Sequence, residues 1–175
     1  MTEAVLTTAK GPSEDAEPRW LTDEEQDAWR ALVSLMLMLS GPLDAQLQRD
    51  SRLSLFEYLV LSHLSHAPER RLRMSELAQL ANGSLSRLSN VVKRLEQRGW
   101  VHRQLDSCDG RYTVATLTDD GFAILAAAAP GHVQAVRHYV IDPLTTTQLR
   151  AITAAGQRIR ERLRTTPDVG THTCC

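Results

Sequence analysis

Apolar residues recur every three or four positions between residues 29 and 47, which is the spacing of one face of an α-helix. Residues 22–25 (Thr-Asp-Glu-Glu) have the pattern of a capping box, so we expect the helix to begin there. Leu35 and Met38 widen the apolar stripe beyond one face, and such a helix needs more than one neighbour. The pattern favours burial against a second subunit, with an intrachain core helix as the alternative. Gly41-Pro42 should kink or briefly interrupt the helix.

Two shorter helices are predicted next. Ser54 and Glu57 form a second capping box ahead of an apolar stretch that ends near residue 66. Residues 70–73 (Arg-Arg-Leu-Arg) could form a very short strand, and residues 74–81 have helical spacing. Asn82-Gly83 then predicts a turn, because both residue types tolerate a left-handed backbone.

The helix after this turn divides into two distinct faces. Ser84 is a suitable N-cap, and Gly99 is a suitable residue just beyond the C-terminus. One face is apolar, with Leu88, Val91, Val92 and Leu95. The other face is polar and basic, with Ser86, Arg87, Ser89, Asn90, Lys93, Arg94 and Gln97.

Residues 100–105 and 112–117 alternate as strands do, and Asp109-Gly110 between them is a turn signal. The pair is therefore predicted to form a β-hairpin. A short helix, a tight turn, a basic helix and a hairpin are together a helix-turn-helix with a wing.

The C-terminal part of the chain is predicted to be helical. A helix starts at residues 118–121 and runs through an alanine-rich stretch to residue 129. Pro130-Gly131 should interrupt it, and the pattern resumes over residues 133–141. Thr145 caps a last helix, whose apolar residues are expected to point inward: Leu149, Ile152, Ile159 and Leu163.

The fold class is thus mainly α with a small β-hairpin wing. We expect a single domain over residues 20–164, with a winged helix-turn-helix at 54–118 and dimerisation helices at 20–50 and 122–164. Residues 1–19 and 165–175 have no periodicity and are expected to be flexible tails.

The net charge of −1 hides an uneven distribution. Between residues 70 and 111, nine Lys or Arg stand against four Asp or Glu, an excess of five positive charges. Such an asymmetry can focus an anionic partner on one face, although a solvated basic face would look the same in sequence.

Several classes of protein are disfavoured. Three cysteines (Cys108, Cys174, Cys175) do not make a disulfide framework, and without a Cys-x-x-Cys pair we expect no metal or other cofactor. No apolar run approaches the length of a membrane span, and the acidic N-terminus is unlike a secretory signal, so we expect a cytoplasmic protein. The sequence motifs of hydrolases, metalloproteases and nucleotide-binding enzymes are missing, and we expect no catalysis.

Double-stranded DNA is the expected partner, since short polar groups approach base edges and cations reach phosphates. Arg87 can pair with a guanine and Asn90 with an adenine, each worth about 1–3 kcal/mol of discrimination. Asp109 would repel phosphate and is expected to orient Arg111 or a neighbouring cation. The complete predicted DNA site is Ser84, Ser86, Arg87, Ser89, Asn90, Lys93, Arg94, Arg103, Asp109 and Arg111.

Four segments carry a resemblance to a known family. They are Ser75-Glu76-Leu77-Ala78, residues 84–95, Arg98-Gly99-Trp100-Val101, and Asp106-x-x-Asp109-Gly110-Arg111 followed by Leu117-Thr118 and Gly121. Over residues 20–163 the chain resembles the MarR (multiple antibiotic resistance regulator) family of winged-helix transcription factors.

This resemblance implies an obligate homodimer on a (pseudo)palindromic operator, with its two winged helices about 34–36 Å apart. It implies repression relieved by a small anionic phenolic ligand or by oxidation, and a minor-groove contact for Arg111. Many relatives carry an arginine where this chain has Asn90, so their base preference does not transfer.

The resemblance also implies a ligand pocket between the dimerisation helices and the winged helix. The candidates there are Trp20, Trp29, His63, His66 and Arg70. The alternative is an ordinary structural role, with Trp29 in the core and both histidines as surface or satisfied polar groups.

Two further hypotheses remain open. Cys108 could be a redox sensor, because Arg103 and Arg111 would lower the pKa of its thiol. Oxidation-sensing relatives usually carry their cysteine in the first helix, which favours an incidental thiol here. A winged-helix module that binds protein instead of DNA is the other alternative, and the basic face disfavours it.

Overall fold

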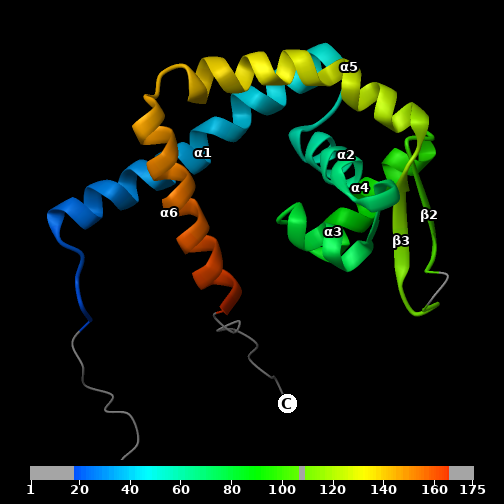
Figure 1. The fold of residues 1–175 in the computed structure, drawn as a ribbon, viewed down its shortest axis with the longest axis horizontal. Helices are drawn as coiled ribbons and strands as arrows, with labels where there is room; N and C mark the ends of the chain where they lie inside the picture. The colour runs from blue at the N-terminus through cyan, green and yellow to red at the C-terminus, as the bar shows by residue number, and fades with distance from the viewer. Residues whose placement is uncertain (1–17, 107–108, 166–175) are drawn as a thin grey trace, which may run out of the picture. The chain divides into compact units, whose positions relative to one another are not determined.

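The computed structural model describes residues 18–106 and 109–165 (Figure 1). Within these ranges the chain is mainly helical with one small antiparallel sheet, as the sequence predicts. The chain divides into two compact units, Met1–Leu37 and Met38–Cys175. None of the helices in the described ranges combines the length and the apolar character that a membrane crossing requires.

Helix α1 (Asp23–Ser51) begins with the predicted capping box. The Glu25 amide donates to Thr22 Oγ1 at 3.3 Å, and the Thr22 amide donates to the Glu25 carboxylate at 2.9 Å. The helix continues through Pro42, so an interruption at Gly41-Pro42 does not occur. Proline fixes φ near the helical value, and the helix loses one amide donor there without ending.

The winged helix comprises three helices and a three-stranded sheet. Helices α2 (Leu55–His66), α3 (Met74–Leu80) and α4 (Leu85–Gln97) group beside the β2–β3 hairpin (Figure 1). The strands are β1 (Arg71–Arg73), β2 (Val101–Leu105) and β3 (Thr113–Leu117), in the order β1-β3-β2. β3 is central and antiparallel to both neighbours, and the predicted short strand at residues 70–73 is thereby confirmed.

The apolar face of α4 forms the centre of the core. Leu88, Val92 and Leu95 have no exposed surface, and Val91 is 4% exposed. They pack with buried residues of the other elements, including Leu61, Leu64, Leu77, Val101 and Ala115. Full burial of one such side chain contributes about 1.5–3 kcal/mol, so this face fixes α4 on the sheet and leaves its opposite face in solvent.

The helix starts follow the predicted caps. Ser54, Ser84, Thr118 and Thr145 each accept a hydrogen bond from the amide three residues further on, at 3.0–3.3 Å. Each cap contributes about 0.5–2 kcal/mol. The turn before α4 places Asn82 at φ 51°, and Gly99 after α4 has φ 75°.

Helix α5 (Asp119–Val136) differs from the prediction at Pro130-Gly131. The helix continues through both residues and passes into a π-helical turn, η2 (Arg137–Ile141), before α6 (Thr146–Thr165). The missing side chain of Gly131 also matters for the packing of α5 against α1. A Cβ there would lie 3.0 Å from Nε2 of the buried Gln46, so the glycine permits α5 to approach α1 closely.

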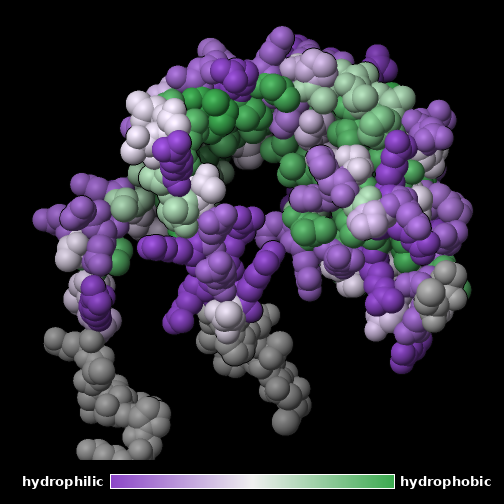
Figure 2. All heavy atoms as spheres, viewed as in Figure 1, coloured by the Kyte–Doolittle hydropathy of each residue, from purple (hydrophilic) through white to green (hydrophobic). Residues whose placement is uncertain are grey.

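Much of the apolar surface outside the winged helix is exposed in the single chain. α6 has no buried residue, and Ile152, Ile159 and Leu163 are 46–70% exposed, so the prediction that they point inward is wrong for one chain. Trp29 on α1 is 54% exposed and is not a core residue of one chain either. Figure 2 shows apolar surface along α5, whereas this view of α6 and of the winged-helix side is mostly hydrophilic. Helical spacing predicts that a face will be covered, but it does not say by which molecule.

Candidate nucleic-acid interface

The exposed side of α4 has a centre and two flanks. At about 100° per residue, Ser86, Asn90 and Lys93 lie opposite the buried face, and all three are exposed. Arg87 and Arg94 lie on the flank that faces α2. Ser89 lies on the flank toward the wing, as does Glu96. The residues predicted to meet DNA therefore occupy the solvent side of the helix together with both of its edges.

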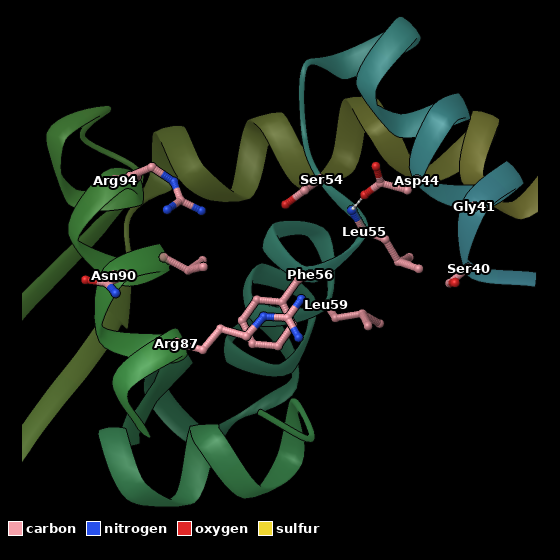
Figure 3. Close-up of a pocket in the computed structure, with 11 residues that line it drawn as sticks. Ser40, Gly41, Asp44, Ser54, Leu55, Phe56, Leu59, Arg87, Asn90 and Arg94 are labelled. Carbon is pink, nitrogen blue, oxygen red and sulfur yellow. Dashed lines mark hydrogen bonds between the residues drawn. The ribbon is translucent and has the colours of Figure 1, made fainter. Parts of the chain in front are cut away.

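Arg87, a predicted base reader, lies against α2. Its guanidinium carbon is 4.3 Å from the centre of the Phe56 ring (Figure 3). A guanidinium over an aromatic face is stabilised by about 0.5–1 kcal/mol at an exposed site. The same ring leaves no room for a side chain at Gly83, whose added Cβ would lie 2.8 Å from Phe56 Cζ. Phe56 thus contacts both the turn and the first turn of α4.

Arg94 is bound to the same helix through a buried carboxylate. Glu57 is 5% exposed and accepts from the Ser54 amide at 2.9 Å, from Ser54 Oγ at 3.0 Å and from Arg94 Nε at 3.5 Å. A buried carboxylate needs such partners, because removal from water penalises its charge. The α2 flank of α4 therefore carries two arginines that α2 holds in place.

On the other flank an ion pair connects α4 to the wing. Arg103 Nη2 lies 2.6 Å and Arg103 Nε 3.0 Å from Glu96 Oε2, and the Arg103 amide donates to Glu96 Oε1 at 3.1 Å. Hydrogen bonds from the Arg103 side chain are the main reason that the pKa of Glu96 is lowered, against a smaller opposing effect of burial. Arg103 was predicted to contact DNA, and the structure gives it a partner within the protein.

On the wing, Arg111 is exposed to solvent and is held by an ion pair with Asp109. Its Nε donates to Asp109 Oδ1 at 2.9 Å and its Nη2 to Asp109 Oδ2 at 2.8 Å, while the Arg111 side chain stays 84% exposed. These bonds lower the pKa of Asp109 and raise the pKa of Arg111. Asp109 orients Arg111, as the sequence predicts.

Between α4 and the wing lies a notch of about 280 Å³ that sequence reasoning missed. Leu85 and Ser89 line it from α4, Ser75 from α3, and Arg111, Tyr112 and Thr113 from the wing. The Tyr112 ring lies under Arg73, 4.3 Å from its guanidinium carbon, and Arg73 also pairs with Asp106 at 3.0 Å. The only sequence signal was an apolar residue, Leu85, among the serines that begin α4.

A larger cavity, of about 670 Å³, lies where α1, α2 and α4 meet within the unit Met38–Cys175. Its α2 wall is apolar, and its α4 wall carries Arg87, Asn90 and Arg94 (Figure 3). Asp44 on the α1 side accepts from the Leu55 amide at 2.7 Å, so this carboxylate caps α2. The cavity therefore combines an apolar wall with a cationic one.

A family model described as the MarR family matches residues 53–111. The fold and the sequence are also similar to those of Sco3205, a MarR family transcriptional regulator from Streptomyces coelicolor whose crystal structure is a complex with DNA. The two share 44% identity and a TM-score of 0.79, over 87% of this chain and 95% of that one. The chain belongs to the MarR family.

Two further relatives are also transcriptional regulators. AbsC, a MarR family regulator from Streptomyces coelicolor, is 37% identical with a TM-score of 0.78, over 85% of this chain and all of that one. The HTH-type transcriptional repressor Rv2887 of Mycobacterium tuberculosis (strain ATCC 25618 / H37Rv) is 37% identical over 98 residues, which make up 56% of this chain and 68% of the relative. The protein is thus a DNA-binding transcriptional regulator, and its relatives are regulators and not enzymes.

The five ligand candidates of this MarR-family chain do not line the larger cavity. Trp20 and Trp29 are 81% and 54% exposed in the first unit. In the second unit Arg70 pairs with Asp119 at 3.0 Å and lies 4.1 Å over the Phe122 ring. His66 Nδ1 is 2.7 Å from the Ser62 carbonyl, and burial, then the charge of His66, lowers the pKa of His63.

The cysteine hypothesis concerns residues that the structure leaves undescribed. Cys108, Cys174 and Cys175 all lie outside residues 18–106 and 109–165. Within those ranges, no three His, Cys, Asp or Glu side chains come together in a group that could hold a metal ion.

Proposed function

We propose that the protein is a homodimeric repressor whose two α4 helices recognise the halves of a (pseudo)palindromic operator. The observation that carries this proposal is the polar, basic face of α4 beside the exposed Arg111, in a chain 44% identical to a regulator crystallised with DNA. The similarity to Rv2887, which is named a repressor, supports repression over activation. Such a role also agrees with the cytoplasmic location that the sequence predicts.

In this proposal α4 enters the major groove, and the wing reaches the adjacent minor groove. Ser86 and Asn90 are central on the exposed face and approach base edges, while Lys93 reaches a phosphate. Arg111 enters the minor groove, where the negative potential favours a cation. The two hydrogen bonds to Asp109 hold the guanidinium of Arg111 in place, and this reduces the entropy that the side chain loses on binding.

The exposed apolar faces of α1 and α6 support dimerisation by a second copy of this chain. On α6, Ile152, Ile159 and Leu163 lie on one face with heptad spacing, and all are exposed. α6 is rich in arginine, whereas the first turn of α1 carries Asp23, Glu24 and Glu25. Opposite charges on the two helices favour pairing α1 of one subunit with α6 of its partner.

The cavity between α1, α2 and α4 is the best-supported site for a releasing ligand. Its apolar wall of Leu55, Phe56 and Leu59 suits an aromatic ring, and Arg87 and Arg94 suit a carboxylate. A small anionic phenolic compound has both features. Because both arginines belong to α4, a ligand bound there would change the position of the helix that meets DNA.

DNA binding is tested by selecting operators from a random library, followed by fluorescence anisotropy at several salt concentrations. We expect Arg111→Ala to weaken binding about equally on all selected sequences and to reduce the salt dependence, because a charge contact is lost. Asn90→Ala should instead change the order of preferred bases. Arg49→Ala is the matched control, since Arg49 is likewise exposed and paired, with Asp50 at 2.9 Å. Equal behaviour of Arg111→Ala and Arg49→Ala would contradict the assigned role.

Ligand release is tested by adding a panel of phenolic acids to the protein–operator complex. We expect at least one to dissociate the complex of the parent protein. Leu59→Trp should abolish this response while it preserves operator binding, because the larger side chain fills the cavity without altering the exposed face of α4. A response that persists unchanged in Leu59→Trp would place the ligand elsewhere, with Trp20, Trp29, His63, His66 and Arg70 as the next candidates.

A further inference from the structure

Leu85 is a large apolar residue at the start of α4 that the described chain covers only in part. It is the first residue of the helix and is 52% exposed, although Leu88, one turn later on the same side, has no exposed surface. Its neighbours Ser84 and Ser86 are exposed and polar. A large apolar side chain held in water at this position is unfavourable in the free protein.

The side chain of Leu85 faces the notch between α4 and the wing. Ser89, one turn further along α4, continues the same wall. Arg103, Arg111, Tyr112 and Thr113 form the opposite wall, and the buried Met74 of α3 also lines the notch. The notch therefore has cationic and hydroxyl groups on the wing side and one large, half-exposed apolar group at the tip of the helix.

DNA would cross this notch if the proposed function is correct, and the inference rests on that placement. With α4 in the major groove and the wing in the adjacent minor groove, the strand that separates the two grooves passes between them. Ser89 and the hydroxyl of Tyr112 suit the phosphates and sugars of that strand. The polar phosphates and sugars of the DNA offer Leu85 no apolar partner.

The major-groove edge of DNA offers one apolar group, the C5 methyl of thymine. We propose that Leu85 reads a thymine methyl on the strand that crosses the notch, once in each half of the operator. Contact with the methyl removes apolar surface of both partners from water. Cytosine lacks the methyl group, so Leu85 is a specificity-determining residue that favours thymine at this position.

The test removes the methyl group without changing any hydrogen bond. Each thymine of a selected operator is replaced by uracil, symmetrically in both halves, and the affinity of the full chain is measured. For the parent we expect one position to lose about fourfold per half-site, which corresponds to about 0.8 kcal/mol for one buried methyl-sized group. Leu85→Ala should bind the thymine and uracil forms of that position equally.

Leu80→Ala is the matched control, because Leu80 is a 43% exposed leucine at the end of α3 that lies outside the notch. It should reproduce the parent's pattern of losses. The inference is overturned if Leu85→Ala keeps the parent's loss, or if no uracil substitution weakens the parent. A library from which no sequence is enriched would overturn the proposed function itself and the role of Leu85 with it. Normal selection of an operator without methyl sensitivity would overturn the role of Leu85 alone.

Discussion

His132 on α5 is half-buried, and its ring lies 4.3 Å from that of Tyr58 on α2. Its Nδ1 is buried and has no hydrogen-bond partner among the described residues. Burial lowers the pKa of His132 below its usual value of 6.5, because a charged imidazolium would be poorly solvated there. A residue that packs well when neutral thus becomes unfavourable when protonated.

The consequence is a loss of stability in mild acid. The folded pKa of His132 is lowered, so the unfolded chain binds more protons below about pH 6.5, and stability decreases as pH falls through that window. His63 contributes with the same sign. We expect the free energy of unfolding from urea titrations to be lower at pH 5.5 than at pH 7.5.

The variant His132→Phe should flatten this dependence, and adding His63→Gln should flatten it further. Carboxylates with a lowered pKa, such as Glu96, lose their contribution only at more acidic pH, so the window above pH 5.5 isolates the histidines. An unchanged slope in the double variant would show that neither histidine is responsible.

At the scale of elements, the start of α5 is attached to the segment that follows α4 and leads into the wing. Thr118 Oγ1 donates to the Gly99 carbonyl at 2.7 Å, and the Thr118 amide donates to the Trp100 carbonyl at 3.1 Å. Gly121 completes the junction, since a Cβ there would lie 2.1 Å from the Trp100 carbonyl oxygen. The junction therefore sets where α5 leaves the DNA-binding unit.

Gly121→Ala should be strongly destabilising, by roughly 2 kcal/mol or more, because the opposing atom is backbone and cannot move without distorting β2. Thermal unfolding followed by circular dichroism would measure the effect. Gly110→Ala is the control, since among the described residues other than its two chain neighbours no heavy atom lies within 4 Å of the position its Cβ would occupy. Similar unfolding temperatures for Gly121→Ala and the parent would contradict this account of the junction.

At the scale of the whole molecule, the winged helix has its own core, whereas α6 has no buried residue in the single chain. A 20-residue helix with this much exposed apolar surface would gain stability from a partner that covers it. The proposed homodimer would provide that partner.

We expect Ile152→Glu to convert the dimer to monomers, because it would bury a charge in the proposed interface. Ala154→Glu introduces the same charge two residues away on the same exposed helix, off the apolar stripe, and should leave the dimer intact. Sedimentation velocity of both variants would distinguish them. Dimers of equal stability would exclude the α6 face from the interface.

Sequence determined the features that depend on local interactions. The caps at Thr22, Ser54, Ser84, Thr118 and Thr145 involve residues three positions apart, and all of them are present. The left-handed residues Asn82 and Gly99 and the pairing of Asp109 with Arg111 are equally local. Together with the two faces of α4, these features were enough to predict a winged helix and its resemblance to the MarR family.

Tertiary structure decided what depends on residues far apart in the chain. Pro130 remains within α5, beside a Gly131 that lets α1 approach, so the proline signal did not decide the helix end. Arg87 stacks on the Phe56 ring and Arg103 forms an ion pair with Glu96, although the sequence alone indicated neither partner. Leu85 and the apolar faces of α1 and α6 are exposed because the fold of one chain does not cover them. Periodicity predicts an apolar face, but it cannot specify which neighbour packs against it.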